Sequence, residues 1–382
     1  MKLIIIKNNL KKGLNIIERV TGKNPTLPVL NNILIKVKQN FLTLVGTDLE
    51  IGMEYRTLIK MEQEGQISIP AKPFSSLINS LVDEDMQIEL KGKDDTLIVS
   101  GKDFKSYIKG LSPDDFPIIP KVKNEKDFIE INSTPFLNGV LKVLDFCSQG
   151  QTHPELCGVY FNIQKEKMEM VSTDSFRLAK KDMYYENKIN KGYSFILPQK
   201  AVKEVANIIS EVSSQTKKEF KTKIYFEPNQ LFFEFLSEDF SFPQFCLTSR
   251  LIEGVFPNYQ EIIPKDYKTQ IILNKEDFLN KIKTASLFSG RTNKVNLKVD
   301  PSKNLITFFA QDPDIGEHKS SMDGKIGGEK ADISFNFKFL IDGISNLEDG
   351  SVIFELNGED GPALLKSTKD TGYIYILMPI KS

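Results

Sequence analysis

The chain has 382 residues, of which 40% are apolar, and a formal net charge of -1 that results from 50 basic and 51 acidic side chains. At about 100 to 200 residues per domain, this length predicts two to four domains, each with enough apolar residues for a core. A single small module is therefore excluded. The near-neutral total provides no global field that would attract nucleic acid.

The sequence has no features of export or of disulfide bonding. No apolar run approaches the roughly 18 residues that span a bilayer, and Lys2 leads into a strand-like segment rather than a signal peptide. We therefore expect a soluble, cytoplasmic protein. The three cysteines, Cys147, Cys157 and Cys246, include no CxxC pair. This pattern favours a reducing compartment and core thiols over disulfides or a thiolate zinc site.

Helical periodicity recurs six times along the chain. In the first segment, residues 7–20, Leu10, Leu14 and Ile17 share one face. Prolines predict the start of the next three helices, because proline is favoured at the first helical position, and Asn274 is a candidate N-cap of the fifth. Each remaining segment likewise has apolar residues at helical spacing. They are 72–82 with Phe74, Leu77, Ile78 and Leu81; 135–146 with Phe136, Val140, Leu141 and Leu144; 198–210 with Val202, Val205 and Ile209; 274–285 with Phe278, Ile282 and Ala285; and 337–347 with Leu340, Ile341, Ile344 and Leu347.

Alternating apolar residues between these helices predict strands, and the second strand of each set ends at an aspartate. Asp48, Asp174 and Asp312 follow the first apolar residue of the preceding helix by 38, 38 and 34 residues. Such agreement predicts one α+β unit of two helices and about eight antiparallel strands, repeated three times. The predicted strands are 32–37, 43–48, 158–163, 169–174, 295–299 and 306–312, and the predicted domains are 1–123, 124–253 and 254–382.

Motifs for catalysis are absent from the sequence. It contains no GxxxxGK[ST] or GxGxxG loop, no HExxH and no GxSxG, and its two histidines, His153 and His318, lie in different repeats. The Thr47-Asp48 and Thr173-Asp174 pairs could form a carboxylate dyad, but their equivalent positions favour turns in which the short side chain bonds the backbone. We therefore expect no catalytic residues, cofactor or metal.

The positive charge is concentrated in the predicted helices. Their segments hold twelve basic and six acidic side chains, so the rest of the chain is acidic. A basic helical layer suits a surface that faces phosphates, because nonspecific duplex binding is mostly cation-phosphate attraction. The twelve cations are Lys7, Lys11, Lys12, Arg19, Lys72, Lys142, Lys200, Lys203, Lys275, Lys281, Lys283 and Lys338.

Short motifs along essentially the whole chain resemble those of the bacterial sliding clamp family, the beta subunit of DNA polymerase III. The motifs are Pro25-Thr-Leu-Pro-Val-Leu30, Gly46-Thr-Asp-Leu-Glu50, Ile69-Pro-Ala-Lys72, Asp115-Phe-Pro117, Thr173-Asp-Ser-Phe-Arg-Leu-Ala179, Leu197-Pro198, Phe256-Pro-Asn-Tyr259, Phe335-Asn336 and Met378-Pro-Ile380. The resemblance implies a non-catalytic processivity factor. It also implies three clamp-type domains per chain and a head-to-tail homodimeric ring around duplex DNA, with the helices lining the hole.

The resemblance also implies three sets of site residues. Two departures from the family pattern concern partner binding: Ser175-Phe176 replaces Gly-His, and Glu261 stands where a basic residue is common. The implied DNA contacts, with two lysines added from the helix charge, are Asn24, Lys72, Gln149, Gln199, Lys200, Lys11 and Lys12. The implied pocket for peptides of the polymerase, the clamp loader and other partners is Leu156, Thr173, Ser175, Phe176, Arg177, Leu178, Pro257, Ile262, Asn336, Phe339, Ile376, Met378, Pro379 and Ile380. The implied dimer contacts are Tyr107 and Ile108 with Leu287 and Phe288.

Two other classes of function remain open from the sequence. One is a hydrolase that uses carboxylates and a divalent metal, with Asp174 as a candidate. The other is a scaffold that binds protein segments but not DNA. Charge reversal at Lys11, Lys12 and Lys200 distinguishes the scaffold from the clamp.

Overall fold

The structure is a computed structural model that describes residues 1–22, 26–83, 86–150, 152–185, 191–215, 219–236 and 241–381. The chain divides into two compact units, residues 1–137 with 200–252 and residues 138–199 with 253–382. The division passes through the second predicted repeat. Each unit therefore holds one complete repeat and part of the second.

All six predicted helices form. They are α1 (Lys7–Ile17), α2 (Ala71–Ser80), α3 (Ser133–Leu141), α4 (Gln199–Gln215), α5 (Lys275–Ser286) and α6 (Phe337–Ser345). Asn274 accepts a hydrogen bond from the backbone N–H of Asp277 at 3.1 Å, which confirms the predicted N-cap of α5. The prolines are displaced from the predicted first position: Pro73 is the third residue of α2, and Pro198 precedes α4.

Most residues of the predicted helix faces are buried, whereas Leu77, Leu81 and Ile341 are half-buried and Leu141 is exposed. Leu10, Leu14 and Ile17 of α1 are fully buried, as are Phe278 and Ile282 of α5. Leu141, expected on the buried face of α3, is instead 48% exposed. The reason is that Leu141 directly follows the buried Val140, and one helical step turns its side chain about 100° away from the buried face.

The first unit contains two antiparallel sheets. The order of the smaller sheet is β5 (Lys60–Gln63), β1 (Lys2–Ile6), β7 (Gln87–Lys93), β8 (Thr96–Ser100) and β9 (Lys105–Lys109). The order of the larger sheet is β10 (Phe128–Asn132), β15 (Lys221–Glu227), β16 (Gln230–Leu236), β17 (Phe245–Arg250), β4 (Ile51–Leu58), β3 (Phe41–Thr47), β2 (Asn32–Lys38) and β6 (Gly65–Pro70). β17 pairs with β4, so this sheet runs without interruption from the second repeat into the first.

The second unit is built in the same way. The order of its larger sheet is β14 (Tyr193–Pro198), β11 (Gly158–Ile163), β12 (Lys167–Thr173), β13 (Arg177–Tyr184), β26 (Tyr373–Leu377), β25 (Ala363–Ser367), β24 (Ser351–Leu356), β18 (Thr269–Asn274) and β22 (Lys325–Gly328). The order of its smaller sheet is β21 (Gly316–Asp323), β20 (Leu305–Asp312), β19 (Lys294–Asp300) and β23 (Ala331–Asn336). Here β13 of the second repeat pairs with β26 of the third.

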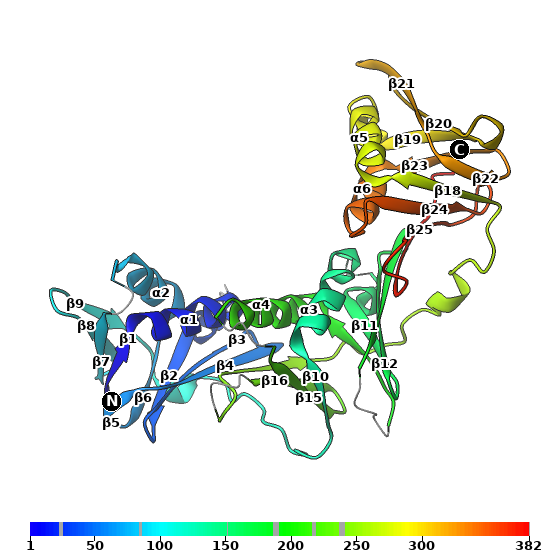
Figure 1. The fold of residues 1–382 in the computed structure, drawn as a ribbon. Helices are drawn as coiled ribbons and strands as arrows, with labels where there is room; N and C mark the ends of the chain where they lie inside the picture. The colour runs from blue at the N-terminus through cyan, green and yellow to red at the C-terminus, as the bar shows by residue number, and fades with distance from the viewer. Residues whose placement is uncertain are drawn as a thin grey trace. The chain divides into compact units, whose positions relative to one another are not determined.

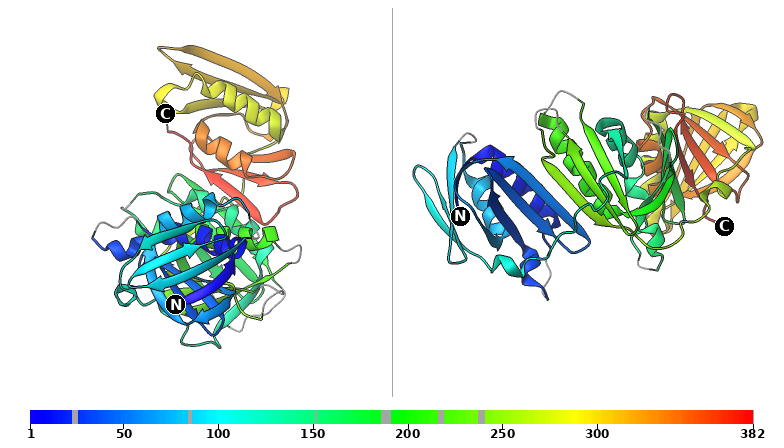
Figure 2. Two further views of the ribbon diagram at one scale, coloured as in Figure 1. Left: turned by 90° about the vertical axis from the view of Figure 1, so that its left-hand side faces the viewer. Right: turned by 90° about the horizontal axis from the view of Figure 1, so that it is seen from below.

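Paired helices cover the sheets of both units. In the first unit α1 packs beside α2 and against β3 and β4 (Figure 1). In the second unit α5 packs beside α6 and against β20 and β21, and Figure 2 shows this pair, in yellow and orange, from two further sides. The predicted combination of two helices with antiparallel sheets is confirmed. The strands expected in each repeat form as β2 and β3, β11 and β12, and β19 and β20.

The aspartate turns bond the backbone, as predicted. Oδ1 of Asp48 accepts the N–H groups of Glu50 and Ile51 at 3.0 and 2.7 Å. Oδ1 of Asp174 accepts those of Phe176 and Arg177, both at 3.0 Å. The Thr47–Ile51 and Thr173–Arg177 turns are therefore the same structure at equivalent places, and the turn interpretation is confirmed over the dyad.

The core-thiol prediction is only partly confirmed. Cys147 is buried, whereas Cys157 and Cys246 are half-buried. Burial raises the pKa of Cys147 to about 12. The Sγ of Cys157 donates to the carbonyl oxygen of Gly150 at 2.9 Å, so this thiol belongs to a loop contact rather than the core.

Candidate partner-peptide site and nucleic-acid interface

The Thr173–Arg177 turn forms one side of the predicted peptide site. The hydroxyl of Thr173 donates to the carbonyl oxygen of Arg177 at 2.7 Å and accepts the N–H of Ser175 at 3.1 Å. Ser175 has a φ of 76°, in the left-handed region that glycine adopts most easily. Both side-chain bonds of Thr173 therefore hold a backbone conformation that a serine adopts at some cost.

Arg177 is the charged centre of this site. Its Nε donates to Asp174 at 2.8 Å and its Nη1 donates to Asp342 at 2.5 Å. Burial alone would lower the pKa of Arg177, but its hydrogen bonds to the two carboxylates outweigh burial and raise it. The guanidinium also lies 4.6 Å from the centroid of the Phe339 ring and 5.1 Å from that of Phe146. Arg177 is thus fixed by two ion pairs and two aromatic faces.

The C-terminal strand forms another side of the site. Leu178 of β13 lies opposite Ile376 of β26. The N–H of Met378 donates to the carbonyl oxygen of Phe176 at 2.9 Å, and that of Ile380 donates to Ser334 at 2.8 Å. The chain after β26 is therefore held beside the Thr173–Arg177 turn.

Aromatic side chains complete this group. The exposed ring of Phe176 stacks on that of Phe339, with 6.4 Å between centroids. The hydroxyl of Tyr375 donates to the carbonyl oxygen of Phe339 at 2.9 Å, and this hydrogen bond holds the backbone of Phe339 in place. The exposed ring and the half-buried Met378 together offer apolar surface next to a fixed cation.

The other predicted pocket residues have different surroundings. Leu156 is buried, whereas Pro257 and Ile262 are exposed on the linker between the repeats. Asn336 uses its side-chain oxygen to accept the N–H of Lys338 at 3.0 Å, at the start of α6. Pro379 is half-buried. Their place in a peptide pocket stays a prediction.

The sequence analysis missed the residues that hold the site. Asp342 lies three residues after Phe339 on α6, so both reach Arg177 from one helix face. This three-residue spacing on the predicted helix 337–347 was the only sequence feature that could have placed Asp342 beside Phe339. The ring of Phe146, which contacts Arg177, lies tilted against that of Tyr375 with 5.0 Å between centroids, and no local pattern indicated their pairing.

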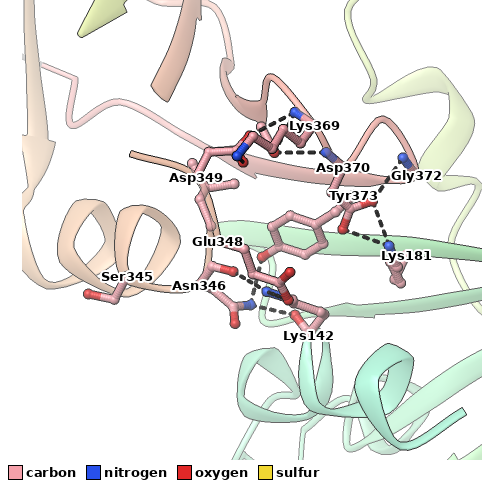
Figure 3. A network of polar contacts seen from close by, with 12 residues as sticks. Lys142, Lys181, Ser345, Asn346, Glu348, Asp349, Lys369, Asp370, Gly372 and Tyr373 are labelled. Atoms are coloured by element: carbon pink, nitrogen blue, oxygen red, sulfur yellow. Dashed lines mark hydrogen bonds and ion pairs between the residues drawn. The ribbon is translucent and has the colours of Figure 1, made fainter. Parts of the chain in front are cut away.

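A polar network joins the second and third repeats next to this site (Figure 3). Lys142 donates to the carbonyl oxygen of Asn346 at 2.6 Å and pairs with Glu348 at 2.9 Å. The side-chain amide of Asn346 donates to the Lys142 carbonyl at 2.7 Å and to the Tyr373 hydroxyl at 2.8 Å. Lys181 of β13 reaches both oxygens of Asp370 at 2.6 Å. These bonds fix the second repeat's strands against the third's.

The predicted helical cations therefore need a correction. Lys7 is buried, and its ammonium donates to the carbonyl oxygen of Leu81 just beyond α2, at 2.5 Å. Lys275 donates in the same way to Ser345 and Leu347 at the end of α6. Arg19 donates to the carbonyl oxygen of Asn15, in the last turn of α1, at 3.1 Å. With Lys142, four of the twelve cations thus bind backbone at helix C-termini, where the helix dipole favours positive charge. The phosphate-facing set contains at most the other eight.

The predicted DNA contacts differ in their surroundings. Lys72 and Lys200 are exposed at the second residues of α2 and α4, whereas Lys11 and Lys12 are half-buried on α1. Lys200 forms an ion pair with Asp48. Asn24 lies outside the described residues.

Two of the predicted contacts are glutamines that bond each other. The side-chain amide of Gln149 donates to Gln199 at 2.8 Å, and the amide of Gln199 donates to the Leu144 carbonyl at 2.8 Å. Their side chains are thus held in place at the start of α4.

The predicted dimer residues lie at the edges of the two smaller sheets. Tyr107 is 63% exposed on β9, which is the last strand of its sheet, and Ile108 is half-buried. Leu287 is exposed just after α5, and Phe288 stacks on His318 of the edge strand β21 at 5.6 Å. Each edge presents backbone groups that another strand could pair with.

Two further features concern membranes and metals. Among the described residues, no helix combines the length and apolar content that crossing a bilayer requires. The same residues contain no group of three or more His, Cys, Asp or Glu side chains placed to hold a metal ion.

Three repeats, each with two helices and antiparallel strands, joined by sheets that cross the repeat boundaries, define a three-domain DNA clamp. Models of the N-terminal, central and C-terminal domains of the DNA polymerase III beta subunit match residues 1–120, 130–258 and 260–381. The chain therefore belongs to the DNA polymerase III beta subunit family, and the role of a polymerase processivity factor follows from this membership.

Relatives with this description span the full chain. The beta sliding clamps of Bacillus subtilis and of Staphylococcus aureus strain Mu50 are each 27% identical to it, with all of both chains covered. The crystal structure of the Bacillus subtilis sliding clamp superposes with a TM-score of 0.91 at 25% identity, covering 100% of this chain and 99% of that one. The Pseudomonas aeruginosa DNA polymerase III subunit beta superposes at 0.90 with 21% identity and full coverage of both chains, and shows the fold alone.

Proposed function

We propose that the chain forms a head-to-tail homodimeric ring that encircles and slides on duplex DNA in the cytoplasm and performs no catalysis itself. The free edges of β9 and β21 support this assembly, because they lie in the first and third repeats and can pair between two copies. The proposed domains of the chain are residues 1–123, 124–253 and 254–382.

Weak cation-phosphate contacts suit a sliding ring. A ring held by topology does not need tight binding, and exposed lysines such as Lys72 and Lys200 give screened attraction without sequence preference. We include Lys11, Lys12, Gln149 and Gln199 in this surface, and Asn24 by family resemblance. The ion pair of Lys200 with Asp48 weakens the attraction of Lys200 for DNA, because phosphate must compete with the carboxylate.

The second proposed element is a site for short peptides of the replicative polymerase, the clamp loader and other partners. The observation that carries it is the group of Phe176, Phe339 and Met378 around the fixed Arg177. Apolar walls beside a few fixed polar groups suit a peptide with hydrophobic anchors.

The ring itself is tested by native mass spectrometry and DNA retention. We expect a dimer, and after loading by the clamp loader with ATP we expect retention on closed circular DNA but loss from the same DNA once it is linearised. A strict monomer, or equal retention on both forms, would refute the ring. Replacing Lys11, Lys12 and Lys200 by Glu should reduce retention and leave the dimer intact, whereas a scaffold that never binds DNA would be unaffected.

The hydrolase alternative has less support than the clamp. Oδ1 of Asp174 accepts two backbone N–H groups, and Oδ2 pairs with Arg177. Both oxygens of the candidate carboxylate are therefore engaged in holding the turn. Metal-dependent turnover that Asp174→Asn abolishes would revive this alternative.

A further inference from the structure

Strand β4 of the first repeat pairs with β17 of the second, and we call this junction the first joint; the pairing of β13 with β26 is the other joint. The backbone arrangement at the first joint is the same as that of the partner-peptide site. The N–H of Arg250 donates to the carbonyl oxygen of Glu50 at 3.0 Å, just as the N–H of Met378 donates to that of Phe176 at 2.9 Å. Strand pairing agrees, because Ser249 lies opposite Ile51 as Leu377 lies opposite Arg177. Glu50 and Arg250 thus occupy the positions of Phe176 and Met378.

A cavity of about 250 Å³ lies at the first joint, within the first unit. Its apolar wall includes Leu49, Pro117, Ile118 and Ile119, from the turn and from the linker after the first repeat. Ile118 is 95% exposed, an unusual position for a large aliphatic side chain that has no partner to cover it. The cavity therefore combines a concave floor with an apolar rim.

A second cavity of about 300 Å³ adjoins the first. The two share Gly52, Ile119, Pro120 and Thr248. A Cβ on Gly52 would lie 2.8 Å from a side-chain carbon of Ile119, so glycine leaves the space that this side chain occupies. Two adjoining cavities suit an extended segment that places a side chain in each.

The charges at this joint differ from those of the partner-peptide site. Glu50 and Arg250 both line the first cavity and both are exposed. Neither side chain forms an ion pair with any residue in the described part of the chain. The equivalent positions at the other joint hold the apolar Phe176 and Met378. The two joints therefore share one backbone arrangement but differ in side chains. One has an exposed carboxylate and an exposed guanidinium, and the other has two apolar side chains at the same positions.

We infer that this joint is a second peptide-binding site, and that its ligand is an extended segment with aliphatic side chains between an acidic and a basic residue. The aliphatic side chains enter the two cavities. The carboxylate meets the guanidinium of Arg250, whose planar donors suit a carboxylate, and the basic group meets Glu50. Because the partner-peptide site has the apolar Phe176 and Met378 at these two positions, the two sites select different segments and do not compete.

The test uses the full-length protein with labelled isoleucine methyl groups in NMR titrations. The probes are acetyl-Lys-Leu-Leu-Asp-amide and its reverse, acetyl-Asp-Leu-Leu-Lys-amide, with acetyl-Ser-Leu-Leu-Ser-amide as the uncharged control. We expect one charged probe to shift the Ile118 and Ile119 methyl resonances saturably, at a Kd at least about tenfold below that of the control. The Ile376 and Ile380 resonances, at the other joint, should not respond.

Matched variants distinguish this site from nonspecific binding. Arg250→Glu should raise the Kd about tenfold or more, whereas Met378→Glu, at the equivalent position of the other joint, should leave the response of Ile118 and Ile119 unchanged. Exchanging the charges with Glu50→Arg and Arg250→Glu together should transfer preference to the probe of opposite direction. No saturable shift with either charged probe, equal binding of the serine control, or equal loss from Met378→Glu would overturn the proposal.

Discussion

The ammonium group of Lys7 binds the carbonyl oxygen of Leu81, 74 residues away, at 2.5 Å. Lys7 is the first residue of α1, and Leu81 directly follows α2. In the third repeat Lys275, the first residue of α5, binds the carbonyls of Ser345 and Leu347 at the end of α6. A lysine that begins the first helix thus neutralises the end of the second in two repeats.

Replacing Lys7 by Met should lower the free energy of unfolding by about 1 to 3 kcal/mol, because the Leu81 carbonyl loses its buried charged donor. Urea denaturation followed by circular dichroism measures this. Lys72→Met removes an exposed lysine of α2 and should change stability by less than about 0.5 kcal/mol. Equal effects of the two substitutions would contradict a structural role for Lys7.

The lowered pKa of Glu169 should make the free energy of unfolding decrease at acidic pH. Burial alone would raise its pKa, but hydrogen bonds from Lys167, Tyr259 and Asn162 outweigh burial and lower the pKa to about 2. Because the folded pKa is below the ordinary 4.5, the stabilisation is complete above pH 4.5 and disappears as the pH falls towards 2. Glu169→Gln should therefore cost about 2 to 4 kcal/mol at pH 7 and progressively less below pH 4.5.

Urea unfolding at pH 7, 4.5 and 3 measures this difference between wild type and Glu169→Gln. Glu359→Gln, in an exposed bend, is the matched control and should change stability at pH 7 by less than about 0.5 kcal/mol. Tyr259 donates to Glu169 at 2.8 Å from the linker before the third repeat. A cost from Glu169→Gln that does not depend on pH would argue against the depressed pKa.

Replacing Met378 and Pro379 together by Ala should weaken the binding of polymerase and loader peptides while leaving the dimer intact. The loss removes apolar surface beside Phe176, so we expect about a tenfold or greater rise in Kd. Fluorescence anisotropy with a labelled peptide from the replicative polymerase measures it, and native mass spectrometry monitors the dimer. Val82→Ala, at a position 93% exposed in the first unit, is the control. Unchanged peptide affinity would refute this placement of the site.

Local patterns predicted most of the fold. The faces of α1 and α5 follow from 3.6-residue periodicity, and the aspartate turns follow from their recurrence at one position of each repeat. The pairing of β17 with β4 and of β13 with β26 could not be predicted in this way, because those strands lie nearly 200 residues apart and pairing across such a distance leaves no local trace.

Side-chain roles were harder to predict than elements. A charge count treats Lys7 and Lys72 alike, although Lys7 is buried and binds a backbone carbonyl whereas Lys72 is exposed. Arg177 was expected in the site from the resemblance, but one of the two ion pairs that fix it comes from Asp342 on a helix of another repeat. Such long-range partners depend on tertiary packing, which a single sequence does not display.

A charged residue on the edge strand β9 should disrupt the proposed dimer. Tyr107 is exposed at this edge, where Lys105 lies 5.5 Å from its ring centroid. Tyr107→Asp would place a charge in the proposed interface between two copies, so we expect the dimer Kd to rise by about 10- to 100-fold. Concentration-dependent native mass spectrometry measures this, and Val82→Asp, exposed but outside any strand, is the control. A dimer that tolerates Tyr107→Asp as well as Val82→Asp would show that β9 is not the interface.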